Sequence, residues 1–308
     1  MRGLNTYFES LLDSENVLSD PGRDKMAVKN WIERNYKPVT NLQIEWSDRH
    51  NTFLVSTQQE YIWVVNKDIE SLTNGMFRWD KVEGDFSCDE CKNLKSLEGA
   101  PKEVSGRFGC NNCNKLTSLE GGPDMVGNIF TCAGCNELIT LEGAPERVDG
   151  GFYCYGCENL LSLKGVPKKI GGGFYCSCCH NLRSLEDAPK EVGEDFDCSR
   201  CENLTSLKGV PKYVKGEFSC KNCFGLTSLE GAPEEVKGDF DCSNCFNLTT
   251  LEGSPKKVGG RFECNDCKKL TSLKGAPQKV RWGIWCIRCN NLKVTYSDQA
   301  KYKKIKIK

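Results

Sequence analysis

The stretch FDCSNCFNLTTLEGSPKKVGGR, residues 240–261, is one copy of a unit that recurs every 22 residues. Its two cysteines form a C-x-x-C motif that appears ten times without insertion or deletion. The twenty cysteines of these motifs are Cys88, Cys91, Cys110, Cys113, Cys132, Cys135, Cys154, Cys157, Cys176, Cys179, Cys198, Cys201, Cys220, Cys223, Cys242, Cys245, Cys264, Cys267, Cys286 and Cys289. A fixed period of this length indicates equivalent structural units stacked in register.

Each unit reads F-x-C-x-x-C-x-x-L-x-S-L-x-G-x-P-x-x-V-x-G-x. The F-x-C segment places side chains alternately inward and outward, as a short strand does. The G-x-P segment predicts a bend, and the Gly after the Val, such as Gly106, suits a second bend or unusual backbone dihedrals. We therefore expect a flattened coil with its Phe, Cys, Leu and Val side chains inside. One coil cannot bury that face alone, so stability must come from contacts between neighbouring coils.

The predicted fold class is a mainly β repeat solenoid of ten 22-residue coils with a small α+β N-terminal cap, residues 1–60. Helices are expected at residues 4–18 and 24–36, and short strands at 41–46, 52–57 and 60–65. The solenoid is expected to span residues 61–292, with 61–85 as a degenerate first coil. Residues 293–308 form a C-terminal cap whose Lys-rich tail, KYKKIKIK (301–308), is expected to cover the last coil as a charged edge strand. A basic contact for an anionic partner is the alternative.

Charge and hydropathy exclude some classes of partner. The chain has 42 basic and 42 acidic residues, and residues 81–300 carry 28 against 30, so the body lacks the positive surface that binds a nucleic-acid backbone. The first residues, MRGLNTYFESLLDSEN, lack the apolar core of a secretory signal. No stretch approaches the roughly 18 apolar residues of a membrane-spanning helix. We expect neither nucleic acid nor membrane as a partner, and a cytoplasmic location, where structural disulfides are rare.

The coil resembles a leucine-rich repeat. FDCSNCFNL (240–248) is similar to the L-x-L-x-x-C-x-x-L core of cysteine-type leucine-rich repeats, with Phe240 and Cys242 at the apolar strand positions and Cys245 at the ladder position. The segment L-x-G-x-P-x-x-V resembles the Pro-rich back of short bacterial leucine-rich repeats. More narrowly, SLEGAPKEV with GDFDCS resembles repeat proteins encoded by bacteriophages and prophages, in which a helical start and a divergent strand segment precede the array. The resemblance covers residues 61–292 well and residues 1–60 loosely.

Three interpretations of the repeated cysteines stay open. In the first they line the interior as small apolar residues, and the S–H at the ladder position faces backbone carbonyls. In the second they bind zinc, which needs four ligands. Each coil supplies two, so coils would pair, yet the residues inside C-x-x-C do not alternate between odd and even coils. In the third they form disulfides within each motif, which export from the cell would favour.

One cysteine, Cys178, lies outside the two regular positions, within CSCC at residues 176–179. We expect it to point outward from its turn and to be the candidate reactive thiol of the chain. A harmless substitution at a variable position is the alternative.

The residues that flank the inward Phe and Cys of each strand are expected to form one outward face. Tyrosines cluster there in adjacent coils and an acidic stripe follows them. The candidate partner-binding residues are Ile129, Tyr153, Tyr155, Tyr175, Asp195, Asp197, Glu217, Asp239, Asp241 and Trp285. Aromatic side chains beside charge are typical of protein interfaces, although aromatic stacking between strands also stabilises a sheet.

The leading hypothesis is a non-enzymatic interaction module of phage-like origin that binds a host or viral protein through this strand face. Alternatives are a structural spacer of a virion or assembly, and a zinc-binding array. Catalysis fits poorly, because the chain has only His50 and His180 as histidines and no phosphate-binding loop. No catalytic residue and no cofactor is predicted, and self-association stays open. A phage-encoded chain would act in the host cytosol, with the virion as the alternative location.

Overall fold

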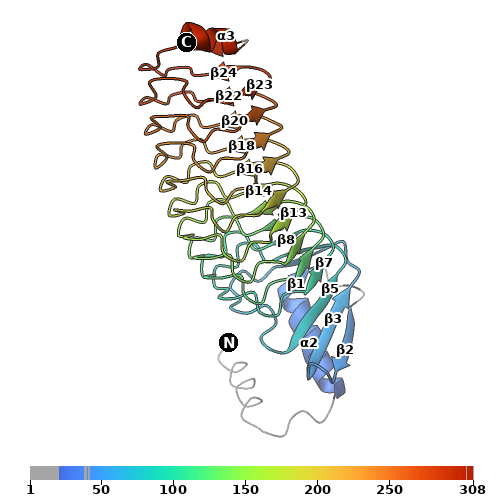
Figure 1. Ribbon diagram of the computed structural model, residues 1–308. Helices are drawn as coiled ribbons and strands as arrows, with labels where there is room; N and C mark the ends of the chain where they lie inside the picture. The colour runs from blue at the N-terminus through green and yellow to red at the C-terminus, as the bar shows by residue number, and fades with distance from the viewer. Residues whose placement is uncertain (1–20, 38–39, 41, 303, 308) are drawn as a thin grey trace.

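The computed structural model describes residues 21–37, 40, 42–302 and 304–307. The chain winds into a β-solenoid whose coils stack from the N-terminal to the C-terminal end (Figure 1). This confirms the predicted fold class. The helix expected at residues 4–18 lies outside the described residues.

Two sheets run along the stack, and each coil contributes one strand to each sheet. Sheet A has thirteen strands. In spatial order they are β1 (Tyr36–Lys37), β4 (Tyr61–Val64), β6 (Asp85–Ser87), β8 (Phe108–Gly109), β10 (Phe130–Thr131), β12 (Phe152–Tyr153), β14 (Phe174–Tyr175), β16 (Phe196–Asp197), β18 (Phe218–Ser219), β20 (Phe240–Asp241), β22 (Phe262–Glu263), β24 (Ile284–Trp285) and β25 (Ile305–Lys306).

Sheet B has twelve strands, most of which end at the Val of the repeat. In spatial order they are β2 (Gln43–Ser47), β3 (Thr52–Thr57), β5 (Phe77–Val82), β7 (Glu103–Val104), β9 (Met125–Val126), β11 (Arg147–Val148), β13 (Lys169–Ile170), β15 (Glu191–Val192), β17 (Tyr213–Val214), β19 (Glu235–Val236), β21 (Lys257–Val258) and β23 (Lys279–Val280). The pairs β1–β4 and β2–β3 are antiparallel and the others are parallel. The β4 and β5 strands of residues 61–85 continue both sheets.

The parallel register places each residue over its equivalent 22 positions away. Phe152 pairs with Phe174, and Tyr153 with Tyr175. Backbone hydrogen bonds continue into the C-x-x-C turn, where the Cys110 N–H donates to the Thr131 oxygen at 2.9 Å and the Asn112 N–H to the Ala133 oxygen at 2.9 Å. Inward positions of the repeat therefore form continuous columns along the stack.

The core of the solenoid is built from these columns. The Phe, Cys and Leu residues of the ten C-x-x-C coils are almost all fully buried, as the sequence predicts. The Phe column runs from Phe86 to Phe262, and ring centroids of successive coils lie 4.9–5.7 Å apart. Burying one such side chain stabilises the folded state by roughly 1.5–3 kcal/mol. Because each ring is covered by the coils on either side of it, the stability of one coil depends on its neighbours.

Different residues close the two ends of the core. At the N-terminal end, helix α2 (Pro21–Asn35) leads into β1, and the buried Tyr36 ring lies 6.0 Å from the Phe86 ring. At the C-terminal end, helix α3 (Tyr296–Lys301) precedes Tyr302, whose buried hydroxyl donates to the Pro277 oxygen at 2.8 Å. Strand β25 then pairs with β24, so Ile305 and Lys306 of the Lys-rich tail form an edge strand on the last coil, as predicted.

Two features of the coil differ from the sequence-based expectation or refine it. Sheet B is not expected from the repeat, because its strands are only two residues long and contribute a single inward Val. The Gly after the Val, such as Gly172, marks a bend but has no positive φ. A Cβ there would lie 2.8 Å from the carbonyl carbon of Gly150, so the backbone packs closely on the preceding coil at this bend. The positive φ occurs instead in the G-x-P segment, for example +85° at Gly99.

Candidate interaction surface and cysteine ladder

From Cys113 onward, the second cysteine of each C-x-x-C motif donates a hydrogen bond to the preceding coil. The Cys201 Sγ lies 3.2 Å from the Cys176 backbone oxygen, and the same contact joins Cys113 to Cys88 at 3.1 Å. It recurs between all successive coils of the array, at 2.9–3.4 Å. This is the buried cysteine ladder that the sequence analysis proposes as one of three interpretations.

Burial sets the chemistry of these thiols. Burial raises the pKa of Cys154 well above its usual range because a thiolate loses its hydration there. All twenty-one cysteines are free thiols in the structure. Within the described ranges, no group of three or more His, Cys, Asp or Glu side chains is arranged to hold a metal ion.

Cys178 differs from the ladder cysteines in its backbone and its exposure. It occupies the third position of its C-x-x-C turn with a φ of +58°, the left-handed conformation that this position adopts in every coil. Its side chain is half-buried, and burial is the main reason that its pKa is raised. The thiol is therefore the most accessible of the chain but is not activated as a thiolate. Its predicted reactivity stays a prediction.

The outward residues of sheet A form a single column beside the buried Phe column. In chain order this outward column holds Trp63, Ser87, Gly109, Thr131, Tyr153, Tyr175, Asp197, Ser219, Asp241, Glu263, Trp285 and Lys306. Successive members are one strand spacing apart, about 4.8 Å. The column places the predicted tyrosines next to the predicted acidic residues.

Tyr153 and Tyr175 stack on each other, with ring centroids 4.6 Å apart and planes inclined by 9°. Each ring lies against a glycine two residues earlier in the strand. A Cβ at Gly151 would come within 2.7 Å of the Tyr153 ring, and one at Gly173 within 2.6 Å of the Tyr175 ring. The glycines thus allow both rings to lie flat on the sheet, half-buried, instead of projecting into solvent.

The Tyr175 hydroxyl joins the stacked rings to the acidic stripe. It donates to the Asp195 Oδ2 atom at 3.3 Å. Loss of hydration and the nearby Asp195 carboxylate raise the pKa of Tyr175, so this hydroxyl stays protonated and donating. The aromatic and acidic parts of the surface are therefore one continuous patch.

Five acidic residues form a carboxylate cluster on sheet A, next to the stacked tyrosines. They are Asp195, Asp197, Glu217, Asp239 and Asp241. Partial loss of hydration and the other four carboxylates raise the pKa of Glu217. No Lys or Arg of the described chain forms an ion pair with any of the five, whereas the neighbouring Glu263 pairs with Arg261 at 3.5 Å. Among the described residues, the negative charge of this cluster is therefore not compensated by an ion pair.

The aspartates of the cluster also support the backbone. The Asp195 Oδ1 atom accepts the Glu217 N–H at 2.7 Å, and the Asp239 Oδ1 atom accepts the Arg261 N–H at 2.6 Å. Asp197 and Asp241 each accept the N–H two residues further along their own turn, at 2.9 and 2.8 Å. Glu217 differs because its carboxylate accepts no hydrogen bond from the residues that the structure describes, which leaves it free for a partner.

The other predicted surface residues lie apart from this cluster or at its margin. Tyr155 is 48% exposed in the C-x-x-C turn that follows β12, and Ile129 is half-buried one coil earlier. Trp285 is five coils beyond Tyr175 in the outward column, about 24 Å at the usual strand spacing. Its ring is enclosed between the Arg261 guanidinium at 4.4 Å and the Lys306 ammonium at 4.0 Å, so it belongs to the C-terminal cap.

The sequence analysis missed a second aromatic pair on sheet A. Tyr61 and Trp63 stack with ring centroids 5.0 Å apart and remain 45% and 42% exposed. Both flank the inward Ile62. The alternation in EYIWVV would therefore have predicted two outward aromatic residues once residues 61–85 were aligned with the repeat. Trp63 begins the same outward column that holds Tyr153.

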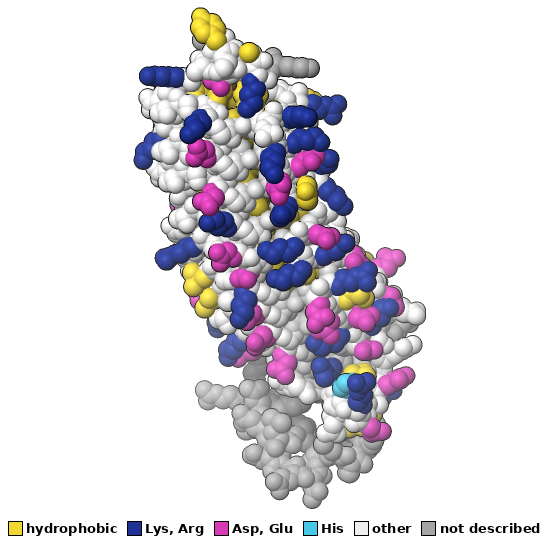
Figure 2. All heavy atoms as spheres, in the orientation of Figure 1, with side chains coloured by type: hydrophobic (Ala, Val, Ile, Leu, Met, Phe, Trp, Pro, Cys, Tyr) yellow, Lys and Arg dark blue, Asp and Glu magenta, His cyan; other side chains and the backbone are white. Residues whose placement is uncertain are grey.

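Outside the carboxylate cluster, several acidic and basic side chains form ion pairs between coils. Lys164 meets Glu142 at 2.7 Å, and Lys208 meets Glu230 at 2.9 Å, each pair 22 residues apart. The face of the molecule in Figure 2 accordingly shows Lys and Arg interspersed with Asp and Glu. The concentration of one sign of charge on sheet A is an exception to this pattern.

Comparison with protein-family models, with curated proteins and with solved structures gave no match. No helix among the described residues has the length and apolarity needed to cross a membrane.

Proposed function

We propose that the protein is a non-enzymatic interaction module that binds a basic segment of another protein through the outer face of sheet A. The observation that carries this proposal is the uncompensated carboxylate cluster beside the stacked Tyr153 and Tyr175. Like charges held together destabilise a fold, and several charges on other faces are paired with opposite ones. A partner that brings Lys or Arg to the cluster would relieve that repulsion, and the flat tyrosine rings would supply contact area.

The resemblance of the repeat to phage-encoded leucine-rich-repeat-like proteins supports a finer form of the proposal. In that form the chain is of phage-like origin and the partner is a host or viral protein. Repeat scaffolds suit this role because the core is uniform while outward residues vary from coil to coil. The outer column of sheet A shows such variation, from small residues at Ser87 and Gly109 to aromatic and acidic residues further along.

A capture experiment with paired surface variants tests the proposal. The double variant Tyr153→Ala/Tyr175→Ala should lose the partner captured from the native host while its circular dichroism and unfolding midpoint stay near those of the parent. The matched control is Phe224→Ala/Phe246→Ala, which removes another stacked aromatic pair, with centroids 5.2 Å apart, away from sheet A. Unchanged capture by the tyrosine variant, or equal loss by the phenylalanine variant, would reject this site.

The electrostatic part of the proposal has its own test. Glu217→Gln keeps the shape of the side chain and removes the charge that is free for a partner. It should weaken capture and reduce the dependence of binding on ionic strength. Glu103→Gln, on the exposed outer side of sheet B, is the matched control and should leave both unchanged. Salt dependence that is the same in both variants would show that the cluster does not contact the partner.

A further inference from the structure

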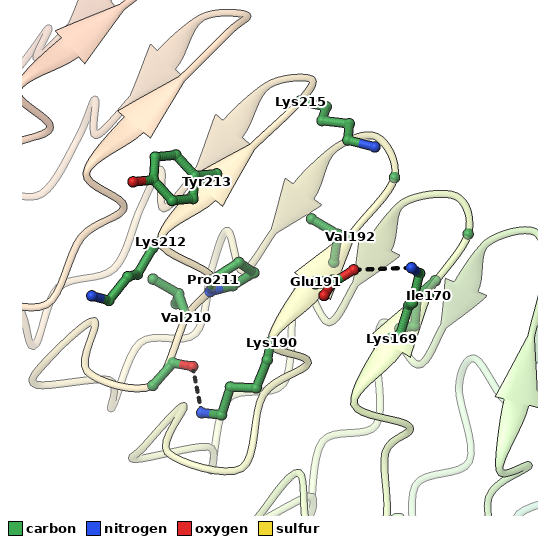
Figure 3. Close-up of a pocket in the computed structure, with 13 residues that line it drawn as sticks. Lys169, Ile170, Lys190, Glu191, Val192, Val210, Pro211, Lys212, Tyr213 and Lys215 are labelled. Atoms are coloured by element: carbon green, nitrogen blue, oxygen red, sulfur yellow. Dashed lines mark hydrogen bonds and ion pairs between the residues drawn. The ribbon is translucent and has the colours of Figure 1, made fainter.

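A hollow of about 710 Å³ lies on sheet B, on the surface that carries β13, β15 and β17 (Figure 3). Its volume is within the range of small-ligand and short-peptide sites. Its lining includes Val210, Pro211, Lys190, Lys212, Tyr213 and Lys215. Figure 3 shows Lys212 and Tyr213 on one side of the hollow and Lys190 and Glu191 on the other.

A single residue type explains why the hollow forms at this place. The position before the repeated Pro is Ala, Gly or Ser in most coils but Val at Val166 and Val210. At both places the preceding glycine has a larger φ, +102° at Gly165 and +105° at Gly209, against +81° to +89° in the other coils. At both places the strand of sheet B keeps one register pair with the coil before it, where the other repeats keep two. The larger side chain thus pushes the following strand away from its neighbour.

The separation at β17 leaves backbone groups without partners. In most coils the residue after Pro donates its N–H to the preceding coil, as Lys190 does to the Lys168 oxygen at 2.8 Å. Along the described chain, no such bond forms from the N–H groups of Lys212 and Tyr213, and none reaches the facing oxygen of Lys190, although the Val192–Val214 pair is kept. At β13 the separation is smaller, because the Gly171 N–H still donates to the Val148 oxygen at 3.0 Å. The hollow therefore exposes a short interrupted ladder of donors and acceptors.

The hollow carries an excess of positive charge. Lys169 is paired with Glu191 at 3.1 Å, and Lys212 with Glu234 at 3.3 Å. The Lys190 ammonium meets only backbone oxygens, among them that of Gly209 at 3.2 Å. Lys215 forms no ion pair with the residues that the structure describes, and it stands at the other end of the separated segment. Two ammonium groups thus remain uncompensated, one at each end of the unpaired backbone.

We propose that this hollow binds a short, extended, acidic peptide segment of a partner protein. Its backbone would pair with the free groups of Lys212, Tyr213 and Lys190, as in strand addition to a sheet. Its carboxylates would lie against Lys190 and Lys215, and one apolar side chain would pack on Val210 and Pro211. This site is separate from the acidic surface of sheet A and opposite to it in charge, so it does not depend on the function proposed above.

Isothermal titration calorimetry of the full chain with the peptide acetyl-Glu-Asp-Val-Asp-Glu-amide tests the proposal. Val210→Ala introduces the residue that most other coils have, so it should close the gap and weaken binding by about tenfold or more. Val166→Ala makes the same change two coils away and should alter binding by less than about twofold. Amide hydrogen exchange should slow at Lys212 and Tyr213 in the first variant only, because those two groups regain an acceptor.

Charge reversal supplies an independent comparison. Lys215→Glu should weaken the peptide by about tenfold or more. Lys237→Glu changes the equivalent position of the next coil, outside the hollow, where Lys237 pairs with Glu235 at 2.7 Å, and should have little effect. The proposal is overturned if the peptide does not bind, if Val210→Ala binds it as the parent does, or if both lysine variants weaken it equally. Displacement of the peptide by inorganic phosphate at equal concentration would also overturn it, since binding would then need only an anion.

Discussion

Replacing Phe196 by alanine would test whether the Phe column connects the two halves of the array. Phe196 is fully buried, and its ring centroid lies 5.3 Å from that of Phe174 and 5.4 Å from that of Phe218. Truncation of a buried Phe to Ala costs about 3–5 kcal/mol. Two aromatic contacts of about 0.5–1.5 kcal/mol each are part of that loss. We expect the free energy of unfolding to fall by about 4 kcal/mol.

Urea denaturation followed by far-ultraviolet circular dichroism and by tryptophan fluorescence measures this change. Four of the six tryptophans lie in residues 31–79 and two, Trp282 and Trp285, in the last coil, so the fluorescence curve should show two steps, and depart from the circular dichroism curve, if the halves uncouple. The matched control is Phe196→Ile, because Ile284 occupies the same position in the last coil and is fully buried there. It should lose less than about 2 kcal/mol, since most of the volume is kept. A loss below about 1 kcal/mol for Phe196→Ala, with both signals coincident, would refute the reasoning.

Three further predictions concern charge and thiol chemistry. Because the pKa of Glu217 is raised in the folded protein, the protonated carboxyl stabilises the fold. This stabilisation is lost as pH rises above the usual pKa of a glutamate. Glu217→Gln should therefore raise stability at neutral pH by a few tenths to about 1 kcal/mol, and thermal unfolding at pH 4 and 7 would show the gain at pH 7 alone. Glu235 has its pKa lowered to about 2 by Lys237 and Lys257. The stabilisation by the ionised Glu235 carboxylate is present above its usual pKa and is lost as pH falls towards 2. A Glu235→Gln variant should therefore lose less stability than the parent over this acid range, and added salt should reduce the difference between the two. A thiol reagent should modify one cysteine of the native chain, faster as pH rises towards the raised pKa of Cys178, and all twenty-one in denaturant. Cys178→Ser should abolish the native reaction; about five zinc ions per chain in elemental analysis would instead support four-ligand sites and contradict the ladder.

The sequence predicts the interior better than the exterior. Because the period is 22 with no insertion, every inward position can be assigned from one copy, and the Phe, Cys and Leu columns are buried as assigned. The second sheet could not be predicted, since a two-residue strand such as Glu103–Val104 shows no alternation. The hydrogen bond from the Cys201 thiol to the preceding coil could not be predicted either, because its acceptor depends on how the coils stack.

Surface predictions depend on contacts that no single repeat contains. Tyr153 and Tyr175 could be placed together because they are 22 residues apart at one repeat position. Trp285 was placed on the same face, and the register agrees, but its enclosure needs Lys306 from the returning tail. The effect of Val210 on sheet B could not be foreseen, because Ala and Val are both ordinary apolar residues until the spacing between coils is known.

The thiol ladder has a genetic consequence. Each donor reaches an acceptor 25 residues earlier, always in the adjoining coil, as Cys223 does to the oxygen of Cys198. Loss or gain of one whole unit by in-frame recombination would restore every such pair at the new junction. The copy number of coils can therefore drift between related genes while the interior stays the same, and the pattern of outward residues would record which units were lost or duplicated.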